Sequence, residues 1–204
     1  MQLDGSRRFE LRGVVSSVGF ASGDRFVIGH WISSPIGAFT DLMWATADGT
    51  RHLRVPSPRA LAFVSGIYAF DTAEVTPLTA TVTASSVDVH AGDLEVALRA
   101  GRSRPIPFSR VPGVTRWVQD PIARVTMGVR TYGRSPHGVR EWYRADSYRL
   151  VREASGTIGG ADLGALAPLI DPPVRFGFSE PPRRPSMVWL RPLLEYRAED
   201  VDWG

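Results

Sequence analysis

Residues 39–55 read Phe-Thr-Asp-Leu-Met-Trp-Ala-Thr-Ala-Asp-Gly-Thr-Arg-His-Leu-Arg-Val, and this stretch decides the class of fold. Apolar residues flank the dipeptide Asp48-Gly49, which is a preferred sequence for a two-residue hairpin turn of type I′. We therefore predict a strand over 39–47, a turn at Asp48-Gly49 and a returning antiparallel strand over 50–55.

The sequence on both sides of this hairpin continues in short strand-like segments. Upstream, 9–20 alternates apolar with small or polar residues, and 25–32 reads as a more buried strand. Downstream, Ser57 can cap a helix and Pro58 suits its first position, so a helix is expected over 57–70. Further strands are expected over 74–78, 79–90, 94–99, 125–132, 139–151, 174–178 and 187–194, and a second short helix over 162–167.

These elements predict a mainly β protein, a β-rich α+β fold with one or two short helices. Hairpin signals outnumber β-α-β signals, so the sheet should be largely antiparallel. We expect this sheet to curl into a barrel or cone, with a two-sheet sandwich as the alternative. Residues 1–204 are expected to form one domain that ends in an acidic tail over 195–204.

Two residue types are absent from the 204-residue chain, and each absence excludes chemistry. No cysteine is present, so disulfides, thiol nucleophiles and thiolate metal sites are excluded. All 24 basic residues are arginine, and a chain without lysine cannot form a Schiff base, a Walker A loop or a Ser–Lys dyad. The four histidines are widely spaced, so we expect no metal site, and no motif indicates a cofactor.

The charge and the hydropathy pattern bear on location and partners. The formal net charge is only +3. No signal peptide is evident, and no apolar stretch approaches the roughly 18 residues of a membrane span, so a cytoplasmic protein is expected. Residues 99–116 carry several arginines and no acid, a pattern that nucleic-acid binding can use. Prolines interrupt the segment, so we expect a solvated loop and no nucleic-acid partner; a homodimer is compatible with the sequence.

The segment Ser33-Ser-Pro-Ile-Gly-Ala-Phe-Thr-Asp41 is the most distinctive motif, placed between two expected strands. Its pattern Ser-Pro-Ile-Gly-x-Phe-x-Asp resembles the Ser-Pro-Val-Gly-Pro-Tyr-x-Glu element of acetoacetate-decarboxylase-like proteins. The resemblance implies that Asp41 lines a cavity, because the acidic residue of that element lines the active site. The family's catalytic lysine has no counterpart here. The alternative interpretation is a bulged turn with Asp41 hydrogen-bonded locally.

A second resemblance covers more of the chain. Through Ser34-Pro-Ile-Gly37, Arg140-Glu-Trp-Tyr143 and residues 172–178, Pro-Pro-Val-Arg-Phe-Gly-Phe, the chain resembles an uncharacterised family of actinobacterial proteins. This resemblance implies no activity.

Residues 140–146, Arg-Glu-Trp-Tyr-Arg-Ala-Asp, combine charged and aromatic side chains. On a strand, Trp142, Arg144 and Asp146 would share one face, which suits either a barrel interior that binds a polar-headed ligand or a solvated face of ion pairs. His30, which precedes Trp31, fits a hydrogen-bonded core histidine or a site residue. The candidate ligand-binding residues are His30, Asp41, Trp44, Glu141, Trp142, Arg144, Asp146 and Arg175.

Three functions remain open from the sequence. The first is binding of a small organic ligand in a barrel cavity. The second is a lyase- or hydrolase-type enzyme, with Asp41, Glu141 or Asp146 as acid or base and Arg144 or Arg175 as an anion clamp. The third is an interaction module that uses the 99–116 loop to bind a protein or nucleic acid.

Overall fold

The computed structural model describes residues 6–106, 132–170 and 172–197. It is mainly β, with one helix among the described residues, α1 (Pro58–Ser65). The strands of the first half are β1 (Ser6–Glu10), β2 (Arg12–Phe20), β3 (Arg25–Ser33), β4 (Phe39–Ala45), β5 (Arg51–Val55), β6 (Thr72–Val75), β7 (Leu78–Val82), β8 (Ser86–Ala91), β9 (Leu94–Ala100) and β10 (Arg104–Pro105). Those of the second half are β11 (Tyr132–Arg134), β12 (Arg140–Trp142), β13 (Ala145–Ile158), β14 (Ala161–Asp162), β15 (Leu166–Ala167), β16 (Ser186–Leu190) and β17 (Leu193–Arg197).

The strands form one large curled sheet and one small sheet. The large sheet has the order β6-β5-β4-β3-β2-β16-β13-β9-β8-β7, with β10 and β14 beside β13 and β15 beside β2. The small sheet has the order β1-β17-β12-β11. All strand pairs between described residues are antiparallel except β5 with β6. The predicted mainly β, largely antiparallel, curled sheet is confirmed as a half-barrel.

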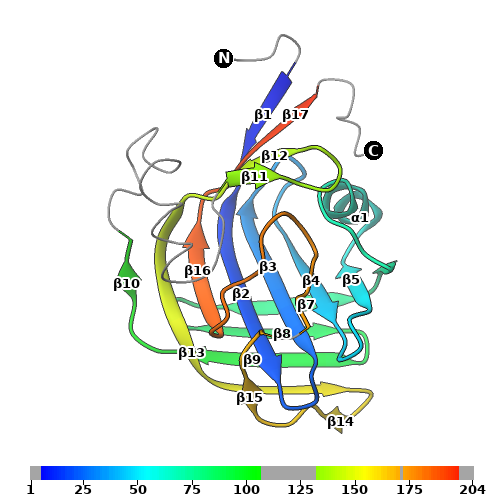
Figure 1. Cartoon of the computed structure of the whole chain (residues 1–204), viewed down its shortest axis with the longest axis vertical. Coiled ribbons are helices and arrows are strands. Elements are labelled where there is room, and N and C mark those ends of the chain that lie inside the picture. The colour runs from blue at the N-terminus through cyan, green and yellow to red at the C-terminus, as the bar shows by residue number, and fades with distance from the viewer. Residues whose placement is uncertain (1–5, 107–131, 171, 198–204) are drawn as a thin grey trace.

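The long strand β13 produces the curl. Its first part pairs with β16 over 145–150, and its second part pairs with β9 over 151–158, with a register shift in each ladder. In Figure 1 this yellow strand sweeps from the upright strands β16 and β2 to the transverse strands β9 and β8 behind them. The large sheet is thereby folded over itself, and β7–β9 lie across one face of β2–β4.

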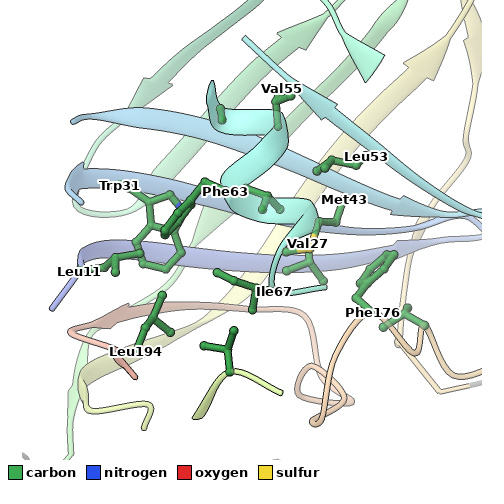
Figure 2. Packing of buried hydrophobic residues seen from close by; sticks show 14 of the residues in the cluster. Leu11, Val27, Trp31, Met43, Leu53, Val55, Phe63, Ile67, Phe176 and Leu194 are labelled. Atoms are coloured by element: carbon green, nitrogen blue, oxygen red, sulfur yellow. The ribbon is translucent and has the colours of Figure 1, made fainter. Parts of the chain in front are cut away.

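Strands β2–β4 are buried on both faces, which explains their nearly continuous apolar sequence. On one face, Phe26, Ile28 and Leu42 pack against residues of β8 and β9, such as Val89 and Val96. On the other face, Val27 and Met43 pack with residues of α1. Figure 2 shows this second cluster, with Phe63 of the helix beside Trp31. The cavity that forms the candidate site, described below, lies in the second cluster.

Helix α1 begins as predicted and ends earlier than predicted. The Ser57 hydroxyl accepts a hydrogen bond from the Ala60 amide, and Pro58 takes the first helical position. The helix ends at Ser65, not at residue 70. Gly66 disfavours its continuation, and the Ala69 amide donates to the carbonyl of Phe176, so tertiary contacts hold the next residues outside the helix.

Three neighbouring chain segments pass from the small sheet to the large sheet, and each is interrupted at the junction between the two sheets. They break at Leu11 between β1 and β2, at 143–144 between β12 and β13, and at 191–192 between β16 and β17. These breaks correct the predicted uninterrupted strands 9–20, 139–151 and 187–194. Trp142 and Asp146 consequently lie on separate strands, in different sheets. Backbone hydrogen bonds across the junction, such as Leu11 N–H to the Pro192 carbonyl, hold the segments together.

The strand predicted over 79–90 is wrong as one element, because a turn at 83–85 divides it into β7 and β8. Two further predicted elements are absent because side chains replace regular backbone pairing. Residues 174–178 are not a strand: the Glu180 carboxylate accepts the amides of Val174 and Arg175, and Arg175 has a positive φ of 52°. Residues 162–167 are not helical: the Asp162 carboxylate accepts the Gly164 amide, and the chain forms short strands on both sides.

The 39–55 hairpin is confirmed, but its turn is not of type I′. Among the turn residues only Gly49 has a positive φ, 91°, whereas a type I′ turn needs two such residues. The Gly49 amide donates to the Thr46 carbonyl and the Thr46 amide to the Thr50 carbonyl, which gives a longer loop.

The expected acidic tail begins inside β17. Glu195 is buried there and forms two ion pairs, Oε2 with Arg8 Nε at 2.6 Å and Oε1 with Arg140 Nη1 at 3.1 Å. Residues 198–204 lie outside the described residues, as do 125–131 of the strand expected over 125–132; its last residue, Tyr132, begins β11.

Candidate functional site

A cavity of about 180 Å³ lies where the two sheets, α1 and the 176–182 segment meet. The three segments that pass between the sheets supply Leu11, Tyr143 and Pro192 to its wall. The remaining wall is largely apolar, with Val15, Val27, Trp31, Met43, Phe63, Val64, Ile67, Ala145, Phe176, Gly177, Phe178, Pro181, Pro182, Val188, Leu190 and Leu194. Its polar members are Ser17, Asp41, Tyr68, Glu141, Ser179, Glu180 and Ser186.

Asp41 is placed in this wall by the pairing of β4 with β3. Its side chain is only 2% exposed, and its Oδ1 accepts a hydrogen bond of 2.8 Å from the indole Nε1 of Trp31. The backbone amides of Gly29, its partner in the ladder, and of Asp41 itself also favour the charged carboxylate. Burial penalises the charged form and raises the pKa of Asp41 to about 7, while these hydrogen bonds oppose the rise.

A glycine at position 29 makes room for this pair. A Cβ atom there would lie 2.6 Å from Asp41 Oδ1 and 2.8 Å from Trp31 Nε1. Both distances are shorter than van der Waals contact, so only glycine allows the carboxylate and the indole to meet over the strand.

Glu141 lies in the same wall and comes from β12 in the small sheet. It is fully buried, and its Oε2 accepts hydrogen bonds of 3.0 Å from the hydroxyls of Tyr68 and Tyr143. Its other oxygen, Oε1, is buried and has no hydrogen-bond partner among the described residues. Burial raises the pKa of Glu141 to about 7, against the opposing effect of the two tyrosine hydrogen bonds.

The hydroxyls of Tyr68 and Tyr143 also hydrogen-bond to each other, which closes a triangle with Glu141 Oε2. Three contacts between three oxygens need three protons if each is to be a hydrogen bond. The two tyrosines supply two protons, because the pKa of each hydroxyl is raised by burial and by the nearby carboxylate. A proton on Oε2 of Glu141 completes the set: Glu141 donates to one tyrosine, that tyrosine donates to the other, and the second tyrosine donates back to Oε2, in agreement with the raised pKa of Glu141. When Glu141 is ionised, both tyrosines can donate to Oε2 instead.

The wall carries three acids and no base among the described residues. The third acid, Glu180, is held by the amides of Val174 and Arg175, which neutralise part of its charge. Asp41 lies close enough to Tyr143 for its negative charge to contribute to the raised pKa of that hydroxyl. The cavity is therefore an apolar chamber with acidic polar groups.

Of the predicted site residues, the structure brings Asp41 and Glu141 together in this cavity. His30 lies on the same strand as Trp31 but its Nδ1 contacts the Thr40 hydroxyl at 2.8 Å, away from the lining, and burial lowers its pKa. Trp44 donates to Asp24 at 2.8 Å and stacks on Phe26 in the other core.

The other four predicted residues are also outside the lining. Trp142 packs against Tyr132, and Arg144 pairs with Glu10 at 2.7 Å. Asp146 pairs with Arg191 at 2.7 Å, and Arg175 is exposed. The anion clamp expected from Arg144 or Arg175 is thus not part of this wall.

Sequence reasoning missed Trp31, Tyr68 and Tyr143 as site residues. Tyr143 stands two positions after Glu141, a spacing that places two side chains on one strand face. Tyr68 follows the helix and gave no signal, because its position depends on where the chain leaves α1.

The 99–116 loop is only partly described. Arg99 pairs with Asp88 at 2.8 Å, Arg102 and Arg104 are exposed, and 107–116 lies outside the described residues. No group of three or more histidine or acidic residues that could hold a metal ion occurs in the described part of the chain. The described helix has eight residues, too few to cross a bilayer.

No protein-family model matches the chain, and no curated protein matches it. A solved structure of acetoacetate decarboxylase from Legionella pneumophila subsp. pneumophila str. Philadelphia 1 is similar, with 9% sequence identity and a TM-score of 0.43. The match covers 95% of this chain and 88% of that chain. This is the family that the 34–41 motif resembles, and the resemblance is weak at both levels.

Proposed function

We propose that this protein binds a small, mainly apolar organic molecule in the cavity between its two sheets. The observation that carries the proposal is the pairing of an apolar chamber of about 180 Å³ with a few buried polar groups, Asp41 and Glu141 among them. Ligand sites in proteins have this composition, since apolar walls supply affinity and a few polar groups set orientation.

The size of the cavity indicates the size of the ligand. An engineered cavity of about 150 Å³ with apolar walls takes up benzene. A volume of about 180 Å³ therefore suits one six-membered ring with a short substituent. Toluene and benzyl-type compounds are suitable probes.

The test uses the methionine methyl groups as reporters. Met43 lines the cavity, whereas Met187 lies in the other core. In a ¹³C-methyl-methionine NMR titration with toluene, the Met43 resonance should shift saturably and the Met187 resonance should stay in place. Equal, non-saturating shifts of both resonances, or none, would refute the proposal.

A cavity-filling variant supplies the specificity control. Ala145 lines the cavity on β13, so Ala145→Phe should abolish the Met43 response to toluene. Ala161 is exposed on β14, and Ala161→Phe should leave the response intact. If the Ala145 variant is folded, as judged by its Met187 resonance, and still responds fully, toluene binds elsewhere.

A second candidate function is general acid–base catalysis by the two carboxyl groups. Burial raises the pKa of both Asp41 and Glu141 to about 7, the range in which one can donate and the other accept a proton at neutral pH. Exchange of the methyl protons of acetophenone in deuterated water would reveal such activity. The exchange rate should exceed that of buffer and fall to it in Asp41→Asn and Glu141→Gln; a rate equal to that of buffer for the unmodified protein would remove this candidate.

A further inference from the structure

We propose that the ligand carries a protonated amine that binds Oε1 of Glu141, with Asp41 as a second carboxylate facing the same cavity. This inference rests on the proposed function and names the chemical class of ligand. It follows from the hydrogen-bond geometry and the charge of the cavity wall.

The first argument is the unpartnered oxygen of Glu141. A buried carboxylate oxygen without a donor is energetically costly, and such atoms are rare in folded proteins. Glu141 is fully buried, lines the cavity, and its Oε1 has no hydrogen-bond partner among the described residues. A donor from a ligand would complete this group.

The second argument is the direction of the hydrogen bonds already present. When Glu141 is ionised, Tyr68 and Tyr143 donate to its Oε2, and Trp31 donates to Oδ1 of Asp41. These hydroxyl and indole hydrogens are already engaged with the protein. The sites left on the two ionised carboxylates are acceptors, so a ligand that binds this form has to donate.

The third argument is charge. Asp41, Glu141 and Glu180 line the cavity, and no described lining residue is basic. An anionic ligand would meet buried like charges, which is strongly unfavourable, whereas a cation favours the charged carboxylates. An alkyl- or arylammonium ion provides both the charge and the donors, and its apolar part fits against Phe63 and Phe178.

Binding exchanges a proton for the ammonium ion. In the free protein the Glu141 carboxyl proton completes the triangle with Tyr68 and Tyr143. The ammonium ion binds the ionised carboxylate, and the carboxyl proton passes to solvent, so charge is conserved. Among the described residues, the other ionisable groups that act on Glu141 or share its cavity are Tyr196, Asp41 and Glu180, in addition to the two tyrosines.

The experiment compares benzylamine with benzyl alcohol, a neutral probe of nearly the same shape, by calorimetry on the full chain. At pH 7.5 benzylamine should bind at least tenfold more tightly. Between pH 7 and pH 5 its affinity should fall several-fold per pH unit, and that of benzyl alcohol should stay constant. At pH 6, buffers of different ionisation enthalpy should reveal close to one proton released per benzylamine bound.

Variants separate the carboxylates from general effects. Glu141→Gln should lower benzylamine affinity at least tenfold, to that of benzyl alcohol, and abolish most of the proton release. Asp41→Asn should lower it by a smaller factor. Asp88→Asn removes a carboxylate on β8 that pairs with Arg99 of β9, far from this wall, and should change neither affinity.

The outcomes distinguish the two proposals. Equal affinities for the amine and the alcohol, or benzylamine binding without proton release, would overturn the amine assignment while leaving the cavity as a ligand site. Failure of toluene, benzyl alcohol and benzylamine alike to shift Met43 would overturn the proposed function, and the amine assignment with it.

Discussion

The indole of Trp31 donates a hydrogen bond of 2.8 Å to the carboxylate of Asp41, across the ladder between β3 and β4. Both residues face the cavity, and β3, the strand of Trp31, carries Gly29 opposite Asp41, where the two groups meet. A buried carboxyl group is thereby held in one orientation at the wall of an otherwise apolar chamber.

The first prediction concerns that glycine. Gly29→Ala should lower the free energy of unfolding by about 1–3 kcal/mol, because its Cβ would overlap Asp41 Oδ1 and Trp31 Nε1. Urea unfolding measures the change. Gly101→Ala is the matched control, since its nearest contacts would be at 3.3 Å or more and lie mainly on a flexible arginine; an equal effect of both substitutions would contradict the packing argument.

The second prediction concerns the pH dependence of stability. The pKa of Glu141 is about 7 in the folded protein, but near 4.3 in an unfolded chain. Between these pH values the unfolded chain loses a proton that the folded protein keeps. The stability associated with protonated Glu141 is therefore fully present below about pH 4 and is lost as the pH rises to about 7, by up to about 1.4 kcal/mol per pH unit.

Asp41 should contribute a similar loss over the same window. Glu141→Gln should therefore reduce the decline in stability between pH 5 and pH 7 by about half, measured by urea unfolding at each pH. His30, whose pKa is lowered by burial, also contributes to the pH dependence of stability. Its contribution is the same in every variant, so it cancels when the variants are compared. Asp88→Asn should keep the full decline, and a Glu141→Gln profile parallel to that of the unmodified protein would show that Glu141 is ionised throughout.

The third prediction concerns the tyrosines. Tyr143→Phe should raise the pKa of Glu141 above about 7, because it removes a hydrogen bond that favours the carboxylate. A ¹³C NMR titration of the glutamate carboxyl carbons measures this. Tyr148→Phe, on β13 and outside the cavity lining, should leave the titration unchanged; a lower pKa in Tyr143→Phe would contradict the assignment.

The fourth prediction concerns the small sheet. Glu195 is buried and joins Arg8 of β1 to Arg140 of β12. Glu195→Gln should destabilise the protein by about 1–3 kcal/mol, because both arginines lose an ionised partner. Amide hydrogen exchange at Phe9 and Leu194 should quicken. Glu10→Gln breaks an exposed pair with Arg144 and should cost less than about 1 kcal/mol; a larger cost than that of Glu195→Gln would reverse the expected order.

The fifth prediction concerns the start of α1. Ser57→Ala should destabilise the protein by about 1 kcal/mol, because the Ala60 amide loses its acceptor. Ser57→Asp should retain most of the stability, since an aspartate side chain can accept the same hydrogen bond. Thermal unfolding of the two variants measures the difference, and equal losses would show that the cap contributes little.

The local elements could be predicted from the sequence where neighbouring residues control the backbone. The hairpin around Asp48-Gly49 and the cap at Ser57 are of this kind, although the hairpin loop is longer than the dipeptide indicated. The predicted strands failed where one segment changes sheets, as at 143–144, and where a side chain such as that of Glu180 binds the backbone amides. Those features depend on partners distant in the sequence.

The candidate site was only partly accessible from the sequence for the same reason. Asp41 was singled out by a motif and Glu141 by a cluster of charged and aromatic residues, and both line the cavity. Asp146 and Arg144 belong to the same cluster, yet they form ion pairs elsewhere. The break after Trp142 separates them from Glu141, and no residue near that break signals it.

By itself, the sequence determined that the chain folds into antiparallel strands and that no thiol or lysine chemistry is available to it. Turn residues, apolar alternation and composition act over a few neighbouring positions, so they can be interpreted directly. Only the tertiary structure decided that Asp41 and Glu141 share one cavity, since strand pairing and the transition between the two sheets bring them together from positions 100 residues apart. Burial at that place, and not the residue types, raises the pKa of each to about 7.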